Sequence, residues 1–262
     1  MRVRLHCRRY LTFCAGMFAL MLAGMAMGQV SESRGVSDSG QMIVVLTKNW
    51  DDFHGRLRRY ERSDLKSNWR EIDQPFPVVV GAKGLGWGQG LQPDAPQLGG
   101  APMKKEGDGK APAGIFLLSS AFGYSAKPLE NARLPYTELT PTVECVDDPH
   151  STHYNQLLET KGIAKDWSSS EQMKRSDELY RWGVVVGYNT NPTRAGAGSC
   201  IFLHIWDGPE QGTAGCTAME APHIETLLRW LDPKKYPVLV QLPETEYLRY
   251  QSAWSLPPTP SK

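Results

Sequence analysis

The sequence predicts a mainly β fold with a few helices, organised as a single domain. Three observations support this prediction: short segments rich in β-branched and aromatic residues recur along the chain, Gly and Pro residues separate them, and only one segment has clear helical periodicity. The chain has 262 residues, of which 40% are hydrophobic and 22% are charged, so it can bury an ordinary hydrophobic core. The formal net charge is +1 and no basic run indicates nucleic-acid binding, so we expect no nucleic-acid partner.

Six segments are predicted to be strands. Each is short, is rich in Val, Ile, Leu, Phe or Trp, and is bounded by Gly, Pro or polar residues, which is the pattern of buried strands. They are residues 42–47, 77–81, 114–119, 182–188, 200–206 and 236–242.

One helix is predicted, in the stretch APHIETLLRWLDP. Pro222 suits the first turn of a helix, and Asp232-Pro233 would end it. Between them the apolar residues fall at i, i+3, i+4 and i+7, on one helical face, at Ile224, Leu227, Leu228 and Leu231.

The N-terminus has the order of a secretory signal peptide. Four arginines precede position 10, an apolar run follows from Leu11 to Met27, and small residues end it at Ala26 and Gly28. A retained membrane anchor is the alternative, but a run of about 17 residues is at the short limit for a span. We therefore expect cleavage near Gly28, a periplasmic protein, and no stable membrane insertion after cleavage.

Composition also suggests where the folded part begins and ends. Residues 31–40, SESRGVSDSG, are polar and rich in Gly and Ser, without apolar periodicity. We therefore expect a signal peptide over 1–28, a flexible linker over 29–41, the folded domain over 42–250 and a C-terminal tail over 251–262.

The cysteines fit an exported chain. Cys7 and Cys14 would leave with the signal peptide, and three cysteines would remain in an oxidising compartment. Three is an odd number, so two can pair and one stays free. Cys216 lies among small residues in the stretch GTAGCTAME, a setting that presents a thiol, so we predict a disulfide between Cys145 and Cys200.

A Cys and His pair could use this thiol. His204 lies twelve residues before Cys216, on a predicted strand, and the loop over 207–212 contains Gly and Pro that can turn the chain. A neighbouring imidazole can take the thiol proton and hold a thiolate-imidazolium pair. Gly215 leaves room for a carbonyl, and backbone N–H groups from Gly215 to Thr217 could form an oxyanion hole. The simpler alternative is that His204 is a buried structural histidine.

Two Gly-rich stretches, GAKGLGWGQG (81–90) and GDGKAP, do not carry a nucleotide motif. No GxGxxG can be placed in the first, and the second lacks the spacing and the Ser or Thr of a P-loop. We interpret both as loops and expect no cofactor.

Several stretches together resemble one known family. EGDGKAPAGIFLL (106–118), CVDDPHSTHYNQLL (145–158), DELYRWGVVVGYN (177–189), GAGSCIFLHIW (196–206) and GTAGCTAM (212–219) are similar to the YkuD-type L,D-transpeptidase catalytic domain, in the branch with exported proteobacterial members. The resemblance covers most of residues 42–243. It implies a β-sandwich with a few helices, and it implies that the domain over 42–250 is catalytic.

The resemblance also implies roles for three residues. Cys216 corresponds to the nucleophile, His204 to the general base and Gly215 to the glycine beside the nucleophile. In this family a backbone carbonyl, rather than a carboxylate, orients the base. We further expect four residues to contact substrate, namely Tyr188, Asn189, Thr213 and Thr217, although Tyr188 and Asn189 could instead end a strand and form a turn.

The motif departs from the common family pattern. That pattern reads Ser-His-Gly-Cys, then any residue, then Arg or Asn, whereas here Ala214 and Ala218 replace the second histidine and the Arg or Asn. Losing an Arg removes a planar, permanently charged anchor for a carboxylate. We therefore expect the nucleophile and base to be retained but the donor position on the stem peptide to differ.

The function expected from the resemblance is a periplasmic peptidoglycan L,D-transpeptidase. It would join stem peptides through a thioester on the cysteine. An L,D-carboxypeptidase or endopeptidase on the same scaffold is the nearest alternative, and a non-catalytic wall-binding protein is another.

A zinc peptidase is the alternative from a different class of enzyme. Its ligands would come from the polar cluster of Asp147, Asp148, His150 and His153, but no metal signature supports it, so we expect no metal site. The Lys104-Lys105 pair and Arg194 are expected on the solvated surface.

Overall fold

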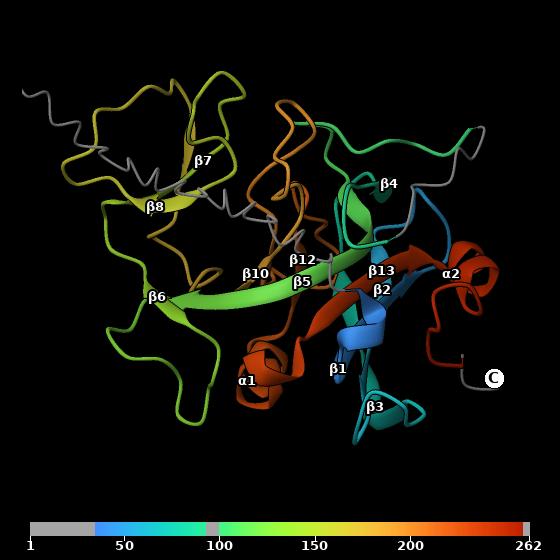
Figure 1. Cartoon of the computed structure of the whole chain (residues 1–262). Helices are drawn as coiled ribbons and strands as arrows, with labels where there is room; N and C mark the ends of the chain where they lie inside the picture. The colour runs from blue at the N-terminus through green and yellow to red at the C-terminus, as the bar shows by residue number, and fades with distance from the viewer. Residues whose placement is uncertain (1–34, 93–99, 259–262) are drawn as a thin grey trace, which may run out of the picture. The chain divides into compact units, whose positions relative to one another are not determined.

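The computed structural model describes residues 35–92 and 100–258, and the predicted signal peptide over 1–28 lies outside them. In these ranges ten strands form one sheet (Figure 1). The strand order is β10 (Trp182–Val186), β11 (Phe202–Ile205), β12 (Thr217–Met219), β3 (Arg70–Val79), β2 (His54–Glu61), β1 (Gln41–Thr47), β13 (Val238–Pro243), β5 (Ala111–Gly123) and β4 (Leu85–Trp87), with β6 (Tyr136–Glu138) paired to β5.

The long strand β5 closes this sheet. Its first half pairs with β13, and its second half pairs antiparallel with β10, the strand at the other end of the order. Figure 1 shows β5 running across the molecule between these partners. The predicted mainly β, single-domain fold is confirmed, and the expected sandwich takes the form of a sheet closed on itself around one apolar core.

All six predicted strand segments overlap strands of this sheet, and the predicted helix is α1 (Ala221–Trp230). Ile224, Leu227 and Leu228 on α1 are buried, as the periodicity predicts. Strand β2 was not predicted, because its sequence HGRLRRYE is dominated by charge. It is a strand because it pairs with both β1 and β3, with Leu57 and Tyr60 buried while Arg58 bonds Glu71 on the neighbouring strand.

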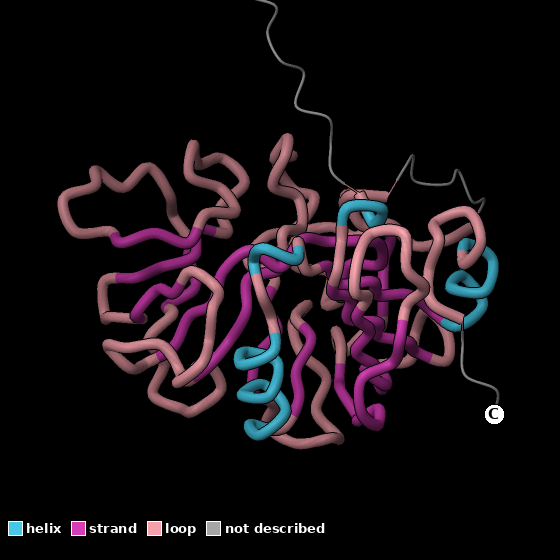
Figure 2. Tube along the Cα trace, turned by 60° about the horizontal axis from the view of Figure 1, so that its bottom comes forward, coloured by secondary structure: helices cyan, strands magenta, loops and turns pink. Residues whose placement is uncertain are grey.

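A second sheet lies beside the first. It has three strands in the order β8 (Leu157–Glu159), β7 (Val143–Val146) and β9 (Ser170–Gln172). We refer to residues 143–172 as the β7–β9 unit. In Figures 1 and 2 this unit stands to one side of the main sheet, most of it in loops.

One covalent bond ties the β7–β9 unit to the main sheet. Cys145 on β7 and Cys200, two residues before β11, form a disulfide and Cys216 is free, as predicted. The expectation that the small residues around Cys216 present its thiol is wrong, because Cys216 is buried. A small apolar cluster packs around this bond and includes Phe122, Phe202 and Cys216. The unit is therefore fixed next to the free thiol by both packing and a covalent link.

The folded domain extends beyond both predicted limits. At the N-terminus, η1 (Val36–Asp38) precedes β1, and Val36 and Ser39 are buried, so the predicted flexible linker is wrong for residues 36–41. Arg62 accounts for this order, because its guanidinium donates to the Val36, Ser37 and Ser39 carbonyls.

The predicted C-terminal tail is also wrong for its first part. Helix α2 (Glu244–Tyr250) leads into a segment in which Trp254 and Leu256 are buried. Trp254 stacks on Tyr250, with ring centroids 4.5 Å apart, and meets Trp87 edge to face at 6.4 Å. The two buried residues, Trp254 and Leu256, stand among Pro and Ser residues without apolar periodicity, so no local pattern marks the segment as folded.

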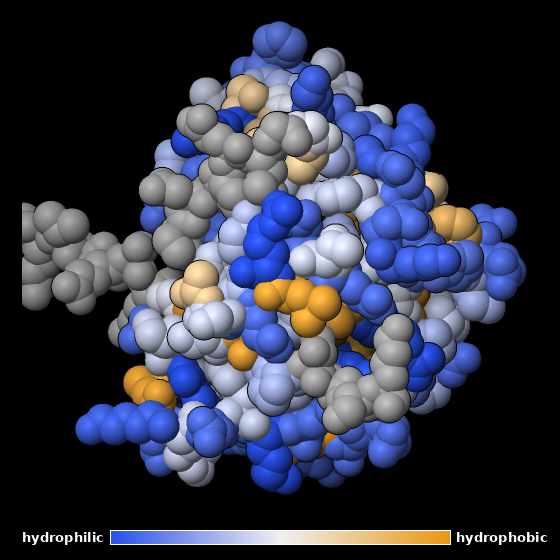
Figure 3. Space-filling view, turned by 90° about the vertical axis from the view of Figure 1, so that its right-hand side faces the viewer, coloured by the Kyte–Doolittle hydropathy of each residue, from blue (hydrophilic) through white to orange (hydrophobic). Residues whose placement is uncertain are grey.

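The face that carries α2 is mainly hydrophilic, with apolar side chains visible only in small separate groups (Figure 3). Large hydrophobic residues that remain exposed in the described ranges include Leu65, Met103 and Leu248. Along the described residues we find no helix with both the length and the apolar character needed to cross a membrane.

Replacing Trp254 with Ala tests the packing of the C-terminal segment. Removing a buried indole from between Tyr250 and Trp87 should lower the free energy of unfolding by about 3 kcal/mol. Urea unfolding followed by fluorescence measures this, with Leu248→Ala on the exposed side of α2 as control. A change within about 0.5 kcal/mol for Trp254→Ala would show that this segment does not pack on the domain.

Removing the disulfide tests its structural role. The cysteines are 55 residues apart, and the chain-entropy relation gives about 4 kcal/mol for closing a loop of that length. The double variant Cys145→Ser, Cys200→Ser should therefore unfold at clearly lower urea concentration than the oxidised protein. Equal midpoints for the two proteins would contradict this expectation.

Candidate active site

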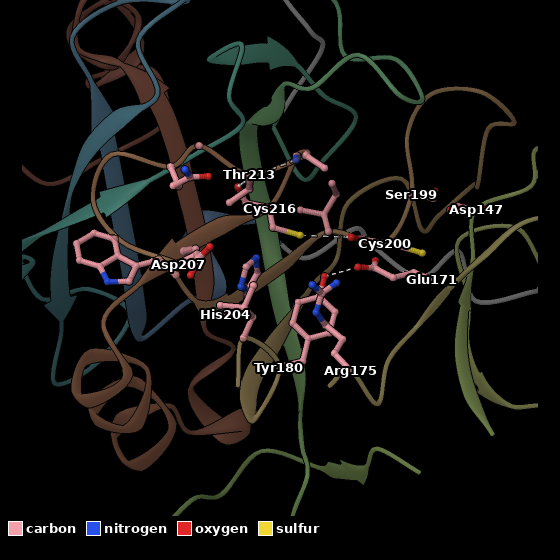
Figure 4. Close-up of a pocket in the computed structure, with 18 of the residues that line it drawn as sticks. Asp147, Glu171, Arg175, Tyr180, Ser199, Cys200, His204, Asp207, Thr213 and Cys216 are labelled. Atoms are coloured by element: carbon pink, nitrogen blue, oxygen red, sulfur yellow. Dashed lines mark hydrogen bonds between the residues drawn. The ribbon is translucent and has the colours of Figure 1, made fainter. Parts of the chain in front are cut away.

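A pocket of about 590 Å³ opens where the β7–β9 unit meets the main sheet, and Figure 4 shows its lining. His204, Gly215 and Cys216 all line it, so the structure brings together the three predicted catalytic residues. The remaining lining comes from residues 104–107, from Asp147 after β7, from Glu171 on β9 and the segment between β9 and β10, from residues 199–201 before β11, from the loop over 206–214 and from Ala218 on β12.

The pairing of β11 with β12 positions the nucleophile and the base. These two short strands are parallel, with Leu203 opposite Thr217 and His204 opposite Ala218. The loop between them is therefore a crossover that returns to the same end of the sheet, rather than a hairpin. This register puts Cys216, just before β12, beside Phe202 at the start of β11.

The crossover loop is fixed by close backbone contacts. Thr213 exchanges main-chain hydrogen bonds with Val80 and Ala82, just after the end of β3. A Cβ on Gly212 would lie 2.5 Å from the Cα of Ala82, and one on Gly81 would lie 2.5 Å from backbone atoms of residues 109 and 111. Only glycine allows these backbones to approach so closely, which explains part of the Gly-rich sequence around residue 81.

Thr213 shapes the turn that carries the cysteine. Its hydroxyl donates to the Cys216 carbonyl at 2.6 Å and accepts from the Gly215 N–H at 3.1 Å. Because the Gly215 N–H is already bonded to this hydroxyl, the oxyanion hole predicted from Gly215 needs that bond to break. Thr213 lines the pocket, but its hydroxyl holds the loop in this structure.

The Cys216 thiol is buried and has main-chain partners. Its sulphur accepts from the Phe202 N–H at 3.3 Å and its hydrogen faces the Cys200 carbonyl at 3.5 Å. Burial raises the pKa of Cys216 to about 12, and the negative charge of Glu171 adds to this rise, while the Phe202 N–H and the Lys104 charge oppose it. The thiol is therefore protonated at neutral pH.

His204 is held in one tautomer. Its Nδ1–H donates to the Ile205 carbonyl at 2.7 Å, which leaves Nε2 with a free lone pair as a proton acceptor. This agrees with the carbonyl-oriented base that the family resemblance implies. Burial lowers the pKa of His204 to about 4, so the imidazole is neutral as well.

The resting site thus differs from the thiolate-imidazolium pair that the sequence suggested. Both groups are neutral, because each is buried and neither charge is solvated. The thiol hydrogen also has to turn from the Cys200 carbonyl to the imidazole before it can be transferred. Such a pair suits general-base catalysis, in which the proton moves as the sulphur attacks.

Ala218 occupies the position where the common family pattern has Arg or Asn. It is fully buried, lies opposite His204 on β12 and lines the pocket. The pocket therefore has apolar surface at the place where that pattern puts a polar or charged side chain.

Two residues predicted to bind substrate are structural instead. Tyr188 and Asn189 are each 1% exposed and lie outside the pocket lining. The Tyr188 hydroxyl donates to the Ala197 carbonyl. Asn189 has positive φ, and its side chain bonds the backbone of Arg194 and Gly198, so it holds the loop that leads to β11. The turn-forming alternative considered for this pair is the one observed.

Thr217 also lies away from the pocket lining. It is 1% exposed on β12, and its hydroxyl donates to the Gln241 side chain on β13 at 2.6 Å. This bond joins β12 to β13, two strands that are not neighbours in the sheet, because β3, β2 and β1 lie between them in the strand order.

Charged and aromatic residues near the thiol are among the pocket residues that the sequence did not identify. Glu171 lies on β9, Arg175 and Tyr180 come from the segment that joins the β7–β9 unit to β10, and Lys104 was expected on the surface. The Lys104 side chain is only 3% exposed and pairs with Asp108 at 2.7 Å. Glu171, Arg175 and Lys104 lie outside the stretches that resemble the family, and Tyr180 lies in one of them without a mark of a role, so only the fold shows that they line the pocket.

In the polar cluster considered for zinc, Asp148 forms hydrogen bonds within the protein and His150 points into solvent. The Asp148 carboxylate accepts from Ser168 and from the His150 N–H, and the His150 side chain is 93% exposed. Within residues 35–92 and 100–258, no group of three or more His, Cys, Asp or Glu side chains is arranged to hold a metal ion.

Alkylation of Cys216 tests the neutral resting state. Since the pKa of the thiol is raised above the ordinary value of about 8.5, its reaction with iodoacetamide at pH 7 should be at least about tenfold slower than that of an ordinary cysteine. The rate should rise about tenfold per pH unit between pH 7 and 10. Peptide mass spectrometry of the Cys216 peptide measures it, with Cys216→Ser as the unlabelled control. A rate that is already constant below pH 8 would indicate a preformed thiolate.

Comparison with known proteins places the chain in a family. The family model of the L,D-transpeptidase catalytic domain, YkuD, matches residues 57–240, which is more than half of the chain and contains the whole pocket. Searches of curated proteins and of solved structures return no match. The chain therefore belongs to the YkuD family of L,D-transpeptidase catalytic domains.

Proposed function

We propose that this protein is an exported, periplasmic L,D-transpeptidase that cross-links peptidoglycan stem peptides through a thioester on Cys216. The observation that carries the proposal is one pocket lined by a free thiol and by an imidazole whose Nδ1 is fixed by a backbone carbonyl. Membership of the L,D-transpeptidase catalytic family supports acyl transfer as the class of reaction.

The proposed reaction has two halves. As the Cys216 sulphur attacks the carbonyl between an L-configured centre and a D-residue, Nε2 of His204 takes its proton. The imidazolium then gives this proton to the leaving amine, so the D-residue departs and a thioester remains. An amine of a neighbouring stem attacks the thioester, loses a proton to Nε2 and regenerates the thiol.

In this scheme, burial of Cys216 and His204 protects the thiol before substrate binds. A thiol that stays protonated until substrate arrives is protected from oxidation in an oxidising compartment. The disulfide between Cys145 and Cys200 supports export for the same reason, because such bonds persist where thiols are oxidised.

The alanine at position 218 supports a change in donor recognition. With no Arg or Asn beside the base, a carboxylate or amide of the donor has no anchor at that point. We therefore propose that this enzyme acts at a stem position other than the usual one for the family.

Incubation with purified muropeptides and mass analysis of the products tests the proposed function. Wild-type enzyme should give cross-linked dimers, Cys216→Ala should give none, and His204→Ala should lower the rate by about 10²- to 10⁴-fold through loss of the base. His54→Asn, an exposed histidine outside the pocket, is the matched control.

The products distinguish the alternatives. Trimmed monomers without dimers would indicate an L,D-carboxypeptidase or endopeptidase on this scaffold. Full activity of Cys216→Ala would overturn thiol chemistry, and loss of that activity with a chelator would then favour a zinc peptidase. Wall binding without any product from the wild type would favour a non-catalytic role.

A further inference from the structure

Lys104 is a buried cation in the wall of the pocket. Its side chain is only 3% exposed, and it belongs to the same pocket lining as Gly215 and Cys216. A main-chain hydrogen bond fixes its position, because the Lys104 N–H donates to the Trp87 carbonyl on β4 at 2.9 Å. An ammonium loses its hydration when it is buried, so its partners in the protein decide what it can do there.

The ammonium of Lys104 has two protein acceptors for its three N–H groups. It donates to Asp108 Oδ1 at 2.7 Å and to the Lys105 carbonyl at 2.5 Å. Within residues 35–92 and 100–258, the third N–H has no protein acceptor. The Asp108 carboxylate is held in turn by the main-chain N–H groups of Lys105 and Lys110, at 2.7 and 2.9 Å. The ammonium is therefore fixed by its own loop and keeps one donor for a molecule in the pocket.

Two glycines let the Lys104 side chain approach the turn that carries Cys216. A Cβ on Gly215 would lie 4.0 Å from the Cε of Lys104, and a Cβ on Gly198 would lie 3.2 Å from its Nζ. The side chain thus packs against the residue that precedes the nucleophile. Burial, the largest cause, raises the pKa of Cys216, and the positive charge of Lys104 opposes this rise. The charge is therefore close enough to act on the sulphur.

The reaction proposed above needs a hydrogen-bond donor near this place. Attack on the carbonyl leaves negative charge on its oxygen, and donors that are already in position stabilise that charge. The Gly215 N–H is not free for this, because it donates to the Thr213 hydroxyl. Arg175, the other lysine or arginine of the pocket lining, forms a bidentate ion pair with Asp177. Lys104 is left as the cation of the lining whose donors are not all occupied.

We propose that the Lys104 ammonium binds the oxyanion that forms when Cys216 attacks the donor carbonyl. The inference rests on the proposed function and adds a catalytic residue to it. As the bond from sulphur to carbon forms, the thiol proton passes to Nε2 of His204 and the carbonyl electron pair moves onto oxygen. The ammonium keeps its three protons and donates one hydrogen bond to that oxygen. This hydrogen bond lasts until the carbonyl re-forms and the amine leaves.

Three variants separate a catalytic lysine from a structural one. Lys104→Met removes the charge but keeps a side chain of similar length, and Asp108→Asn keeps the ammonium but removes its counter-charge. Lys110→Met is the matched control, because that lysine is on the same loop and bonds the Lys83 carbonyl and Asp51 outside the pocket lining. Release of the D-residue from a purified muropeptide monomer, followed in a single turnover, measures acylation alone.

Lys104→Met should lower the acylation rate constant by about 10²-fold, the loss typical of one oxyanion donor, with KM changed by less than about twofold. Asp108→Asn and Lys110→Met should each keep at least about half of the wild-type rate, because the ammonium remains. If Lys104 only holds its loop through Asp108, loss of either partner should be equally harmful. A loss in Asp108→Asn as large as that in Lys104→Met, or a wild-type rate in Lys104→Met, overturns the inference.

Alkylation of Cys216 with iodoacetamide at pH 8.5 gives a second readout that needs no muropeptide. Lys104→Met should react several-fold more slowly than wild type, because the positive charge that favours the thiolate is gone. Asp108→Asn should react no more slowly than wild type. Thermal unfolding, with Lys110→Met as the reference, checks that each variant is folded. An alkylation rate that Lys104→Met leaves unchanged would contradict an action of this charge on the nucleophile.

The outcomes are separable from those of the proposed function. An active wild type whose acylation does not depend on Lys104 overturns this inference alone and leaves the transpeptidase proposal intact. An inactive wild type overturns the proposed function and, with it, the role of Lys104 at the oxyanion.

Discussion

The parallel pairing of β11 with β12 is the constraint on which the site depends. It places a residue near the end of one strand and a residue just before the next on the same part of the sheet, although twelve positions separate them. Parallel strands require a crossover, and here the crossover is anchored at Thr213 to the chain that follows β3. The closure of the sheet by β5 then keeps all of these strands in fixed register.

A second constraint is electrostatic. The apolar cluster that joins the β7–β9 unit to the sheet removes water from both the thiol and the imidazole. Each is therefore most stable without charge, although a reactive nucleophile needs charge at the moment of attack. The neighbours of the sulphur act on this balance. The Phe202 N–H and the Lys104 charge favour the thiolate and lower the pKa of Cys216, whereas the Glu171 charge opposes the thiolate and raises this pKa. The reactivity of the thiol then depends on which of these neighbours a bound molecule changes.

The sequence predicts the parts of this protein that have local patterns. The six strands with β-branched residues and the helix α1 follow from composition and periodicity, and the disulfide follows from an odd cysteine in a small-residue turn. What could not be predicted depends on contacts between distant segments. Strand β2 is a strand only because it has partners on both sides, and Trp254 is an anchor only because Trp87 and Tyr250 lie beneath it.

The same distinction applies to the site. Cys216 and His204 could be identified from motif and resemblance, but Tyr188 and Asn189 could not be assigned correctly, since a strand end next to a cleft and one inside a loop look alike in sequence. Glu171 lies outside every stretch that resembles the family, and the stretch that contains Tyr180 gives it no recognisable role. They reach the pocket because the three-stranded sheet that precedes them is bonded through Cys145 to Cys200, 55 residues further along the chain.

That bond has a consequence for where the enzyme can become complete. The β7–β9 unit supplies part of the pocket wall, and the carbonyl of Cys200, one of the two bridged residues, faces the nucleophile. In a reducing cytoplasm the bridge would not persist, so a newly made chain would lack this wall in its final position. With the export proposed above, the pocket would be completed only after the chain leaves the compartment of its synthesis.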